Sequence, residues 1–297
     1  MSTLATSASS SAPTRRSGLL PGYWFSKNPD KAWGEKFFLL FLPIFLCING
    51  AIMRMGWLDV GNFWNVAQNL LMWVPYCLML PAFLRRHSGV AWYRSYWFKF
   101  NLYMFVFVFF ATYFHTEYFF STLGIRYHFP KISWYLDSAL LGPPEATALA
   151  TYQKIPPGMY LNAIAFFIVY HSCSVVLMRR VRTLTLASSP MLRGLLWVIT
   201  VAAASYFFAW AETYFYVAST DLSKNNVWYV DLPRMLSIGS ACYALYFIVS
   251  FPNVYRLDED AAGERWSLYR TAMEAAAVSM LVLLLLDLFT WIVGPIG

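Results

Sequence analysis

Four ionisable side chains lie within long apolar stretches of this sequence: Glu117, His171, Glu212 and Asp287. An ionisable group inside a membrane-spanning helix is expensive, so it usually faces the interior of a helix bundle and serves a function. Burial in an apolar pocket keeps a carboxylic acid protonated, because it disfavours the charged form, and the acid can then donate a proton. These four residues are therefore the first candidates for acid–base chemistry.

Glu212 is the leading candidate for a proton donor or relay. It lies in the segment SYFFAWAETYF, where Phe208, Phe215 and Tyr216 surround it at helical spacing. The pattern predicts that Glu212 faces the bundle interior, with Phe208 and Tyr216 contacting the bound molecule.

The other ionisable positions have two interpretations each. Glu117 is predicted to share the Glu212 pocket, but it lies near a helix end, from which a carboxylate can also reach water. Asp287, in LLLLDLF, is either a group that binds the substrate or a helix–helix hydrogen-bond anchor. His171 is either catalytic or an interior histidine whose ring nitrogens are satisfied. Tyr113, four residues before Glu117, is expected in the same pocket, with His115 beside them.

Signatures for a metal or a nucleotide are missing from the sequence. The four histidines include no pair at i, i+3 or i+4: His87, His115, His128 and His171. A di-iron desaturase or hydroxylase needs clustered histidines, so that class is excluded. Neither a glycine-rich dinucleotide fingerprint nor a P-loop occurs. We therefore expect no cofactor and no metal.

The composition indicates which elements hold these residues. Apolar residues form 59% of the 297-residue chain and charged residues 12%, about half the charged fraction of a soluble domain. Seven stretches approach or reach the length of a membrane-spanning helix, near 37–53, 63–84, 100–120, 158–178, 194–218, 235–255 and 272–294. The sequence thus predicts an all-α, polytopic transmembrane bundle of about seven spans over residues 36–297. Residues 1–35 are expected to be a polar, disordered tail, with a transit peptide as the alternative, and 121–157 a long loop.

The distribution of lysine and arginine predicts the orientation in the membrane. Of the 22 such residues, 16 fall in the tail and in loops on its side, and the excess marks the cytoplasmic face. The tail is therefore expected in the cytoplasm, with Glu117, Glu212 and Asp287 in the opposite half of the membrane. Because the basic residues occur in short runs between apolar stretches, no nucleic-acid partner is expected. The host membrane would be the endoplasmic reticulum in a eukaryote or the plasma membrane in a bacterium.

Six segments resemble the cycloeucalenol cycloisomerase family: NPDKAWGEKFFLLFLPIF (28–45), YWFKFNLY (96–103), YFHTEYFFSTLG with YHFP (113–130), SYFFAWAET (205–213), YALYFIVSFPNVYRLDE (243–259) and LLDL with GPI (285–296). The likeness runs in the same order from about residue 28 to the end. It implies an isomerase that opens the 9,19-cyclopropane ring of a cyclopropyl sterol, of the cycloeucalenol to obtusifoliol type, without a cofactor.

The resemblance gives the candidate residues a reaction. Protonation of the cyclopropane leaves a tertiary carbocation, which aromatic faces can stabilise and which must then lose a proton. The residues predicted to be catalytic are Glu212, Glu117 and His171. The sterol would contact Tyr113, His115, Phe208, Tyr216 and Asp287. The competing interpretation is a non-enzymatic membrane protein that binds or transports sterols or other lipids, although transport would favour broken helices in two repeats, and the sequence has none.

Overall fold

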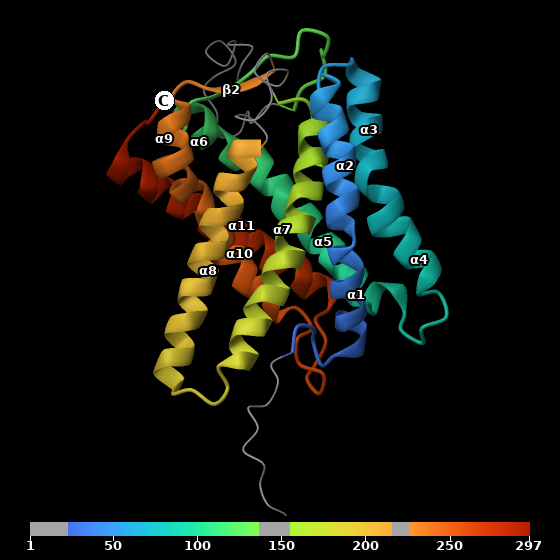
Figure 1. Cartoon of the computed structure of the whole chain (residues 1–297). Helices are drawn as coiled ribbons and strands as arrows, with labels where there is room; N and C mark the ends of the chain where they lie inside the picture. The colour runs from blue at the N-terminus through green and yellow to red at the C-terminus, as the bar shows by residue number, and fades with distance from the viewer. Residues whose placement is uncertain (1–22, 137–154, 216–225) are drawn as a thin grey trace, which may run out of the picture.

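The computed structural model describes residues 23–136, 155–215 and 226–297, and this part of the chain is almost entirely helical (Figure 1). Seven helical segments within it are long and apolar enough to cross a membrane: Pro29–Arg54, Asn62–Leu84, Tyr96–Ser121, Pro157–Leu184, Pro190–Thr213, Leu232–Arg256 and Leu268–Val293. A helix satisfies its own backbone hydrogen bonds, which a bilayer core demands. The predicted all-α bundle of seven spans is confirmed, and the protein is a multi-pass membrane protein.

Four of the spans contain more than one helix. The first consists of α1 (Pro29–Leu39) and α2 (Phe41–Arg54), and the second of α3 (Asn62–Val74) and α4 (Leu80–Leu84). After a 3-10 turn at Trp92–Arg94, the third consists of α5 (Tyr96–Phe110) and α6 (Thr116–Ser121), and the sixth of α9 (Leu232–Arg234) and α10 (Ser240–Arg256). The others are the single helices α7 (Pro157–Leu184), α8 (Pro190–Thr213) and α11 (Leu268–Val293).

A π-helical turn interrupts three of these divided spans in the described residues: Pro75–Met79 (η1), Ala111–His115 (η3) and Met235–Gly239 (η7). A π-helical turn adds a residue to the turn, rotates the side chains that follow, and is frequent at functional sites. The turn at Ala111–His115 contributes directly to the site described below.

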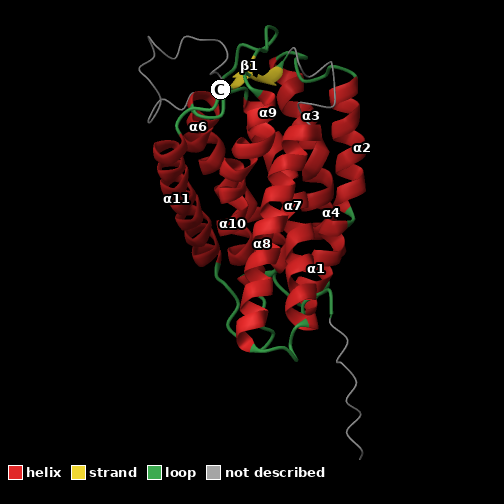
Figure 2. Ribbon diagram, turned by 60° about the vertical axis from the view of Figure 1, so that its left-hand side comes forward, coloured by secondary structure: helices red, strands yellow, loops and turns green. Residues whose placement is uncertain are grey.

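Helix α7 lies at the centre of the bundle (Figures 1 and 2). It packs against α1, α2, α3, α5, α8 and α10, and 78% of its most apolar stretch is buried. Its sides all carry apolar or small residues, among them Ile164, Phe167, Val175 and Met178, and a helix that is apolar all round is a buried one.

A two-stranded antiparallel sheet covers the end of the bundle where the C-terminus lies (Figure 2). Strand β1 (Ile125–Tyr127) follows α6 and pairs with β2 (Val227–Tyr229), with Ile125 opposite Tyr229. The C-terminal segment joins this end, because the Ile296 N–H donates to the Thr122 carbonyl at 2.8 Å. The strands therefore fix the loop after α6 above the helices.

Buried ion pairs hold the opposite end together. Arg179 donates to both oxygens of Glu35, at 2.7 and 2.6 Å, and to Glu259 at 2.8 and 2.6 Å. The Lys31 ammonium lies 3.1 Å from Glu259 and also donates to two backbone carbonyls of the α10 end. Burial of Glu259 tends to raise its pKa. The hydrogen bonds from Arg179 and the charge of Lys31 outweigh this, so the pKa lies below its ordinary value.

Because residues of α1 take part in this ion-pair network, the helical bundle begins earlier in the sequence than predicted. Helix α1 begins at Pro29 and is capped by the side chain of Asn28, which accepts from the Asp30 N–H. Residues 29–35 therefore belong to the helical bundle and not to the tail that was predicted to extend to residue 35. The charged residues of this segment resemble a soluble tail in sequence, but Lys31 and Glu35 are buried against partners more than 100 residues away.

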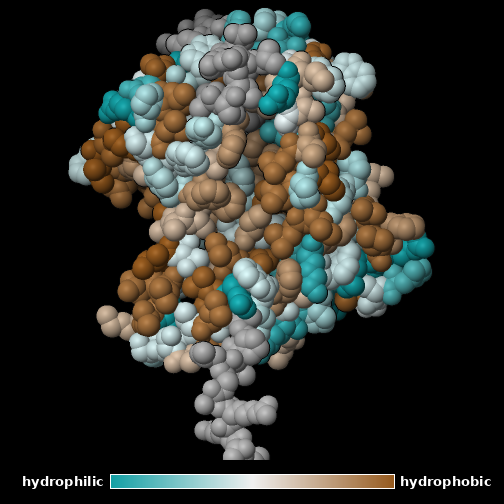
Figure 3. Space-filling model, in the orientation of Figure 1, coloured by the Kyte–Doolittle hydropathy of each residue, from teal (hydrophilic) through white to brown (hydrophobic). Residues whose placement is uncertain are grey.

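Apolar side chains cover the middle of the molecular surface in the view of Figure 3, and hydrophilic residues gather toward its ends. The loops 85–95, 185–189 and 257–267 lie at the end opposite the sheet, and basic residues of the charge bias lie in or beside them, among them Arg85, Arg94, Arg182 and Arg256 (Figures 1 and 2). Which end faces the cytoplasm stays a prediction from the charge bias.

Candidate active site

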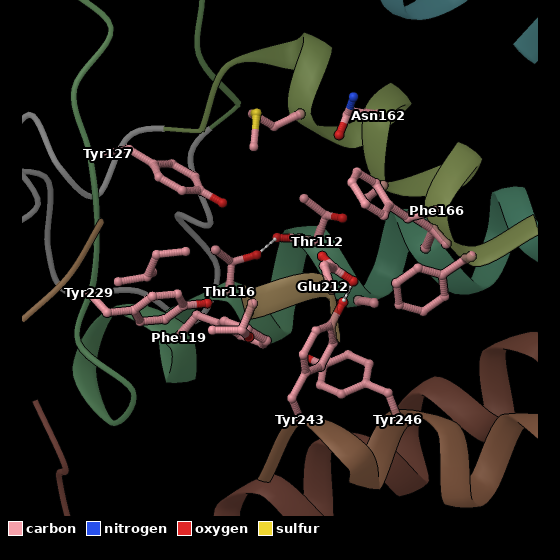
Figure 4. Close-up of a pocket in the computed structure, with 17 residues that line it drawn as sticks. Thr112, Thr116, Phe119, Tyr127, Asn162, Phe166, Glu212, Tyr229, Tyr243 and Tyr246 are labelled. Carbon is pink, nitrogen blue, oxygen red and sulfur yellow. Dashed lines mark hydrogen bonds between the residues drawn. The ribbon is translucent and has the colours of Figure 1, made fainter. Parts of the chain in front are cut away.

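A cavity of about 790 Å³, counted to its open mouth, lies below the two-stranded sheet (Figure 4). Its walls come from the third span, α7, the end of α8, the start of α10 and both strands, and the residues are Val108, Ala111, Thr112, Thr116, Phe119, Ile125, Tyr127, Met159, Asn162, Ala163, Phe166, Phe167, Glu212, Thr213, Tyr229, Tyr243 and Tyr246.

Glu212 is the acid that lines this cavity among the described residues. It lies in the last turn of α8, and its Oε2 accepts a hydrogen bond from the Tyr243 hydroxyl at 2.6 Å. Figure 4 shows the carboxyl directed into the space between Thr112 and Tyr243. A tyrosine of α10 thus fixes the direction of this α8 acid toward the cavity.

Aromatic rings surround this acid on the α10 side. Tyr243 and Tyr246 meet edge to face with centroids 5.4 Å apart, and Phe119 packs edge to face against Tyr243 at 5.0 Å. Phe166 and Phe167 of α7 line another wall. The face of an aromatic ring carries the negative part of its quadrupole, which attracts a cation.

Hydroxyl and amide groups also line the cavity. Thr112 lies within the π-helical turn and Thr116 directly follows it. Asn162 is held by a 3.0 Å hydrogen bond to Asn69 of α3. The hydroxyl of Tyr127 points into the cavity from β1 (Figure 4). Burial raises the pKa of Tyr127 well above its ordinary value, so its hydroxyl stays protonated. A polar ligand group can therefore find donors in the cavity.

Two of the predicted acids lie outside the cavity wall. Positions 112, 116 and 119 form one stripe of the third span, and Glu117 is one residue off that stripe, about 100° around the helix. Asp287 is exposed on α11, on the same face as Leu284 and Trp291, with the Tyr118 hydroxyl 3.4 Å away. The sequence predicts that these acids lie at about the same depth in the membrane as Glu212. Their positions around the helix axes, however, place them outside the cavity wall.

The predicted histidine at 171 lies one turn beyond the cavity on the α7 stripe that carries Phe167. Its Nδ1 lies 2.7 Å from the Phe167 carbonyl, and its Nε2 lies 2.8 Å from the Ser250 hydroxyl of α10. Because a carbonyl only accepts, Nδ1 donates. Both nitrogens of this fully buried ring therefore have hydrogen-bond partners, as the interior-histidine interpretation expects. A catalytic role for His171 stays an untested prediction without contact to the cavity.

The remaining predicted residues surround the cavity at different distances. Tyr113 stacks on Phe109 at 5.9 Å and is not part of the wall. His115 is buried behind Tyr246, with ring centroids 5.3 Å apart. Phe208 lies one turn before Glu212 and packs against Tyr170 at 4.9 Å. Tyr216 lies outside the described residues.

Several wall residues were not singled out from the sequence. Tyr127, Tyr243 and Tyr246 fall within the segments YHFP and YALYFIVSFPNVYRLDE that carry the family resemblance. With 20 tyrosines in the chain, nothing in the residue pattern distinguishes these three from the tyrosines that pack elsewhere. The spacing of Tyr243 and Tyr246, which places both on one helix face, is the signal that was available.

Fold and site together define a multi-pass α-helical membrane protein with an acid in an aromatic-lined cavity. No family model matches the chain, and no solved structure matches it. The chain is 32% identical to cycloeucalenol cycloisomerase from Arabidopsis thaliana over 280 residues, which cover 93% of this chain and 91% of that protein. The protein therefore belongs to the cycloeucalenol cycloisomerase family, as the six sequence segments indicated.

Proposed function

We propose that this protein is a cofactor-independent isomerase that opens the 9,19-cyclopropane ring of a cyclopropyl sterol. The bridging C19 receives a proton as its bond to C9 breaks, and C19 becomes a methyl group. The tertiary cation at C9 then loses a proton from C8, which forms the Δ8 double bond. One proton enters and one leaves, so the product has the mass of the substrate and no oxidant or reductant takes part.

The observation that carries this proposal is the position of Glu212. Protonation of an unactivated carbon needs a neutral acid directed at that carbon in an apolar site. Glu212 lines the cavity, and the Tyr243 hydroxyl holds its carboxyl by a 2.6 Å hydrogen bond. Glu117 and Asp287, the other acids considered, do not line this cavity. Glu212 is accordingly assigned as the proton donor.

The rings beside Glu212 suit the cationic intermediate. Tyr243, Tyr246 and Phe119 lie against one another on the wall nearest the carboxyl, where their π systems can stabilise positive charge at C9 without forming a bond to it. Once Glu212 has given up its proton, its carboxylate is the base of this cavity within the described residues. It is therefore the group assigned to accept the proton from C8.

The distribution of lysine and arginine supports an orientation with the Glu212 cavity in the non-cytoplasmic half of the membrane. A sterol is itself a membrane solute, so a site within the membrane can receive it without passage through water. The host membrane is the endoplasmic reticulum in a eukaryote or the plasma membrane in a bacterium.

The test is conversion of a cyclopropyl sterol by purified protein in detergent micelles with no added cofactor. Mass spectrometry of the sterol should show a product of unchanged mass, and proton NMR should show loss of the cyclopropyl signals. Glu212→Gln, which keeps the shape and removes the acid, should bind the sterol but not convert it. Binding without conversion by the wild-type protein would favour the sterol-binding alternative, and a requirement for NADPH or iron would overturn the isomerase assignment.

A further inference from the structure

A second hollow lies between α10 and α11, in the half of the bundle away from the sheet. Its apolar walls are Val249 and Pro252 on α10, together with Ala277 and Leu281 on α11, and it contains about 520 Å³ counted to its open side. Pro252 lacks a backbone N–H and cannot donate to the preceding turn of α10. The small side chain of Ala277 lies across from it, so the two helices leave a groove on the outer surface of the bundle.

The groove runs from the apolar part of the helices to their basic end. From Val249 to Arg256, seven residues of helix rise about 10 Å, so the polar end lies about 10 Å from the apolar end. Arg256 ends α10 and is exposed. No described residue forms an ion pair or a side-chain hydrogen bond with its guanidinium, so this charge is available at the mouth of the groove.

Glu274 on α11, an acid beside the groove, is paired with groups other than Arg256. Glu274 accepts a hydrogen bond from the Asn253 amide nitrogen at 2.8 Å and lies 3.5 Å from Arg270. Because Glu274 only accepts, the Asn253 amide group must turn its nitrogen to this carboxylate. Its carbonyl oxygen is then buried without a partner in the described part of the chain. The groove therefore has an unpaired cation and an unused acceptor at its polar end.

We propose that this groove binds a phospholipid that carries a net negative charge. An acyl chain would lie along Val249, Pro252, Ala277 and Leu281, and the phosphate would contact Arg256. A guanidinium matches phosphate in geometry and charge, and Asn253 can accept from a hydroxyl or ammonium group of the head group. Arg270, which lies 4.6 Å from the Trp266 ring, adds a cation–aromatic pair of the kind found at membrane interfaces.

The experiment measures lipid binding to purified full-length protein in a neutral detergent by native mass spectrometry, with phosphatidylglycerol and phosphatidylcholine as probes. One basic residue near a membrane surface contributes about 1 kcal/mol, so Arg256→Gln should weaken phosphatidylglycerol binding about fivefold. Phosphatidylcholine binding should weaken less, because its choline cation offsets the charge of the phosphate. Arg94→Gln is the matched control, because Arg94 is exposed at the same end of the bundle and does not line the groove.

A second pair of variants tests the acyl slot. Ala277→Leu should reduce binding of both lipids, whereas Ala202→Leu, at an exposed position of α8, should bind both as the wild type does. The proposal is overturned if Arg256→Gln and Arg94→Gln weaken phosphatidylglycerol equally, or if Ala277→Leu folds and binds both lipids normally. If Ala277→Leu does not fold, the two arginine variants decide the question alone.

Discussion

The hydrogen bond between Tyr243 and Glu212 can be tested by a double-mutant cycle on the rate of sterol conversion. The single variants are Glu212→Gln, which removes the acid, and Tyr243→Phe, which removes the hydroxyl 2.6 Å from Oε2. General acid catalysis contributes about 10²–10⁴-fold, so Glu212→Gln should raise the barrier by about 3–5 kcal/mol. The Glu212 carboxylate forms as the proton leaves, and a hydrogen bond to a charged group is worth about 1.5–3 kcal/mol, so the Tyr243 hydroxyl should lower the barrier by about that amount. Tyr243→Phe alone should therefore slow turnover about 10- to 150-fold.

The prediction lies in how the two changes combine. If Tyr243 acts by directing the Glu212 carboxyl, its hydroxyl has nothing to direct once the acid is gone. Tyr243→Phe should then change the rate of Glu212→Gln less than about threefold, and the coupling energy should be about 1.5–3 kcal/mol.

The assay is the initial rate of product formation from a cyclopropyl sterol, with binding measured separately so that only folded, sterol-bound protein is compared. Glu117→Gln and Asp287→Asn are the matched controls, because neither residue lines the cavity, and both should keep near-normal rates. Multiplicative effects of Glu212→Gln and Tyr243→Phe would refute the reasoning, because Tyr243 would then act independently of the acid. Loss of activity in Glu117→Gln with normal activity in Glu212→Gln would assign the proton to Glu117.

Three further predictions concern stability, measured by thermal unfolding in detergent. A Cβ at Gly158 would lie 2.5 Å from the backbone carbonyl oxygen of Asn65, so Gly158→Ala should destabilise by about 1–3 kcal/mol, whereas Gly194→Ala, with open space around it, should not. Arg179→Met leaves the buried Glu35 carboxylate without its ion-pair partner and Glu259 with Lys31 alone, and should cost about 3–5 kcal/mol; an unchanged melting temperature would contradict the described ion-pair network. The lowered pKa of Glu259 gives stability that is present above its unfolded pKa of about 4.3 and is lost as the pH falls through the lower folded pKa. Glu259→Gln should therefore flatten the decline in melting temperature below about pH 5, and an unchanged acid limb would count against this assignment.

The membrane spans could be predicted closely because hydropathy and length report a requirement that each helix meets by itself. The start of α1 could not. Lys31 and Glu35 resemble a solvated tail until Arg179 and Glu259 are brought beside them, and that contact depends on the packing of α1, α7 and α10. Sequence distance conceals such pairs, since Glu35 and Arg179 lie 144 residues apart.

The site was predicted in part for a related reason. Glu212 is an isolated acid among apolar residues, and the cost of burying a charge makes such a position conspicuous in sequence. Counting residues from the helix ends predicted how deep Glu117 and Asp287 lie in the membrane. It did not predict their positions around the helix axis, which decide whether a side chain reaches a cavity. The sequence left two interpretations of His171 open because its partner Ser250 comes from α10, 79 residues later.

Turnover in heavy water tests the central claim most directly. In the proposed reaction the proton added to C19 comes from the Glu212 carboxyl, which exchanges with water through the open cavity between turnovers. The sterol product made by purified protein in heavy water, with no added cofactor, should carry one deuterium in the new C19 methyl group, located by NMR and counted by mass spectrometry. A product with no solvent deuterium in that methyl group would contradict protonation by a solvent-exchanging Glu212 and favour internal hydrogen transfer.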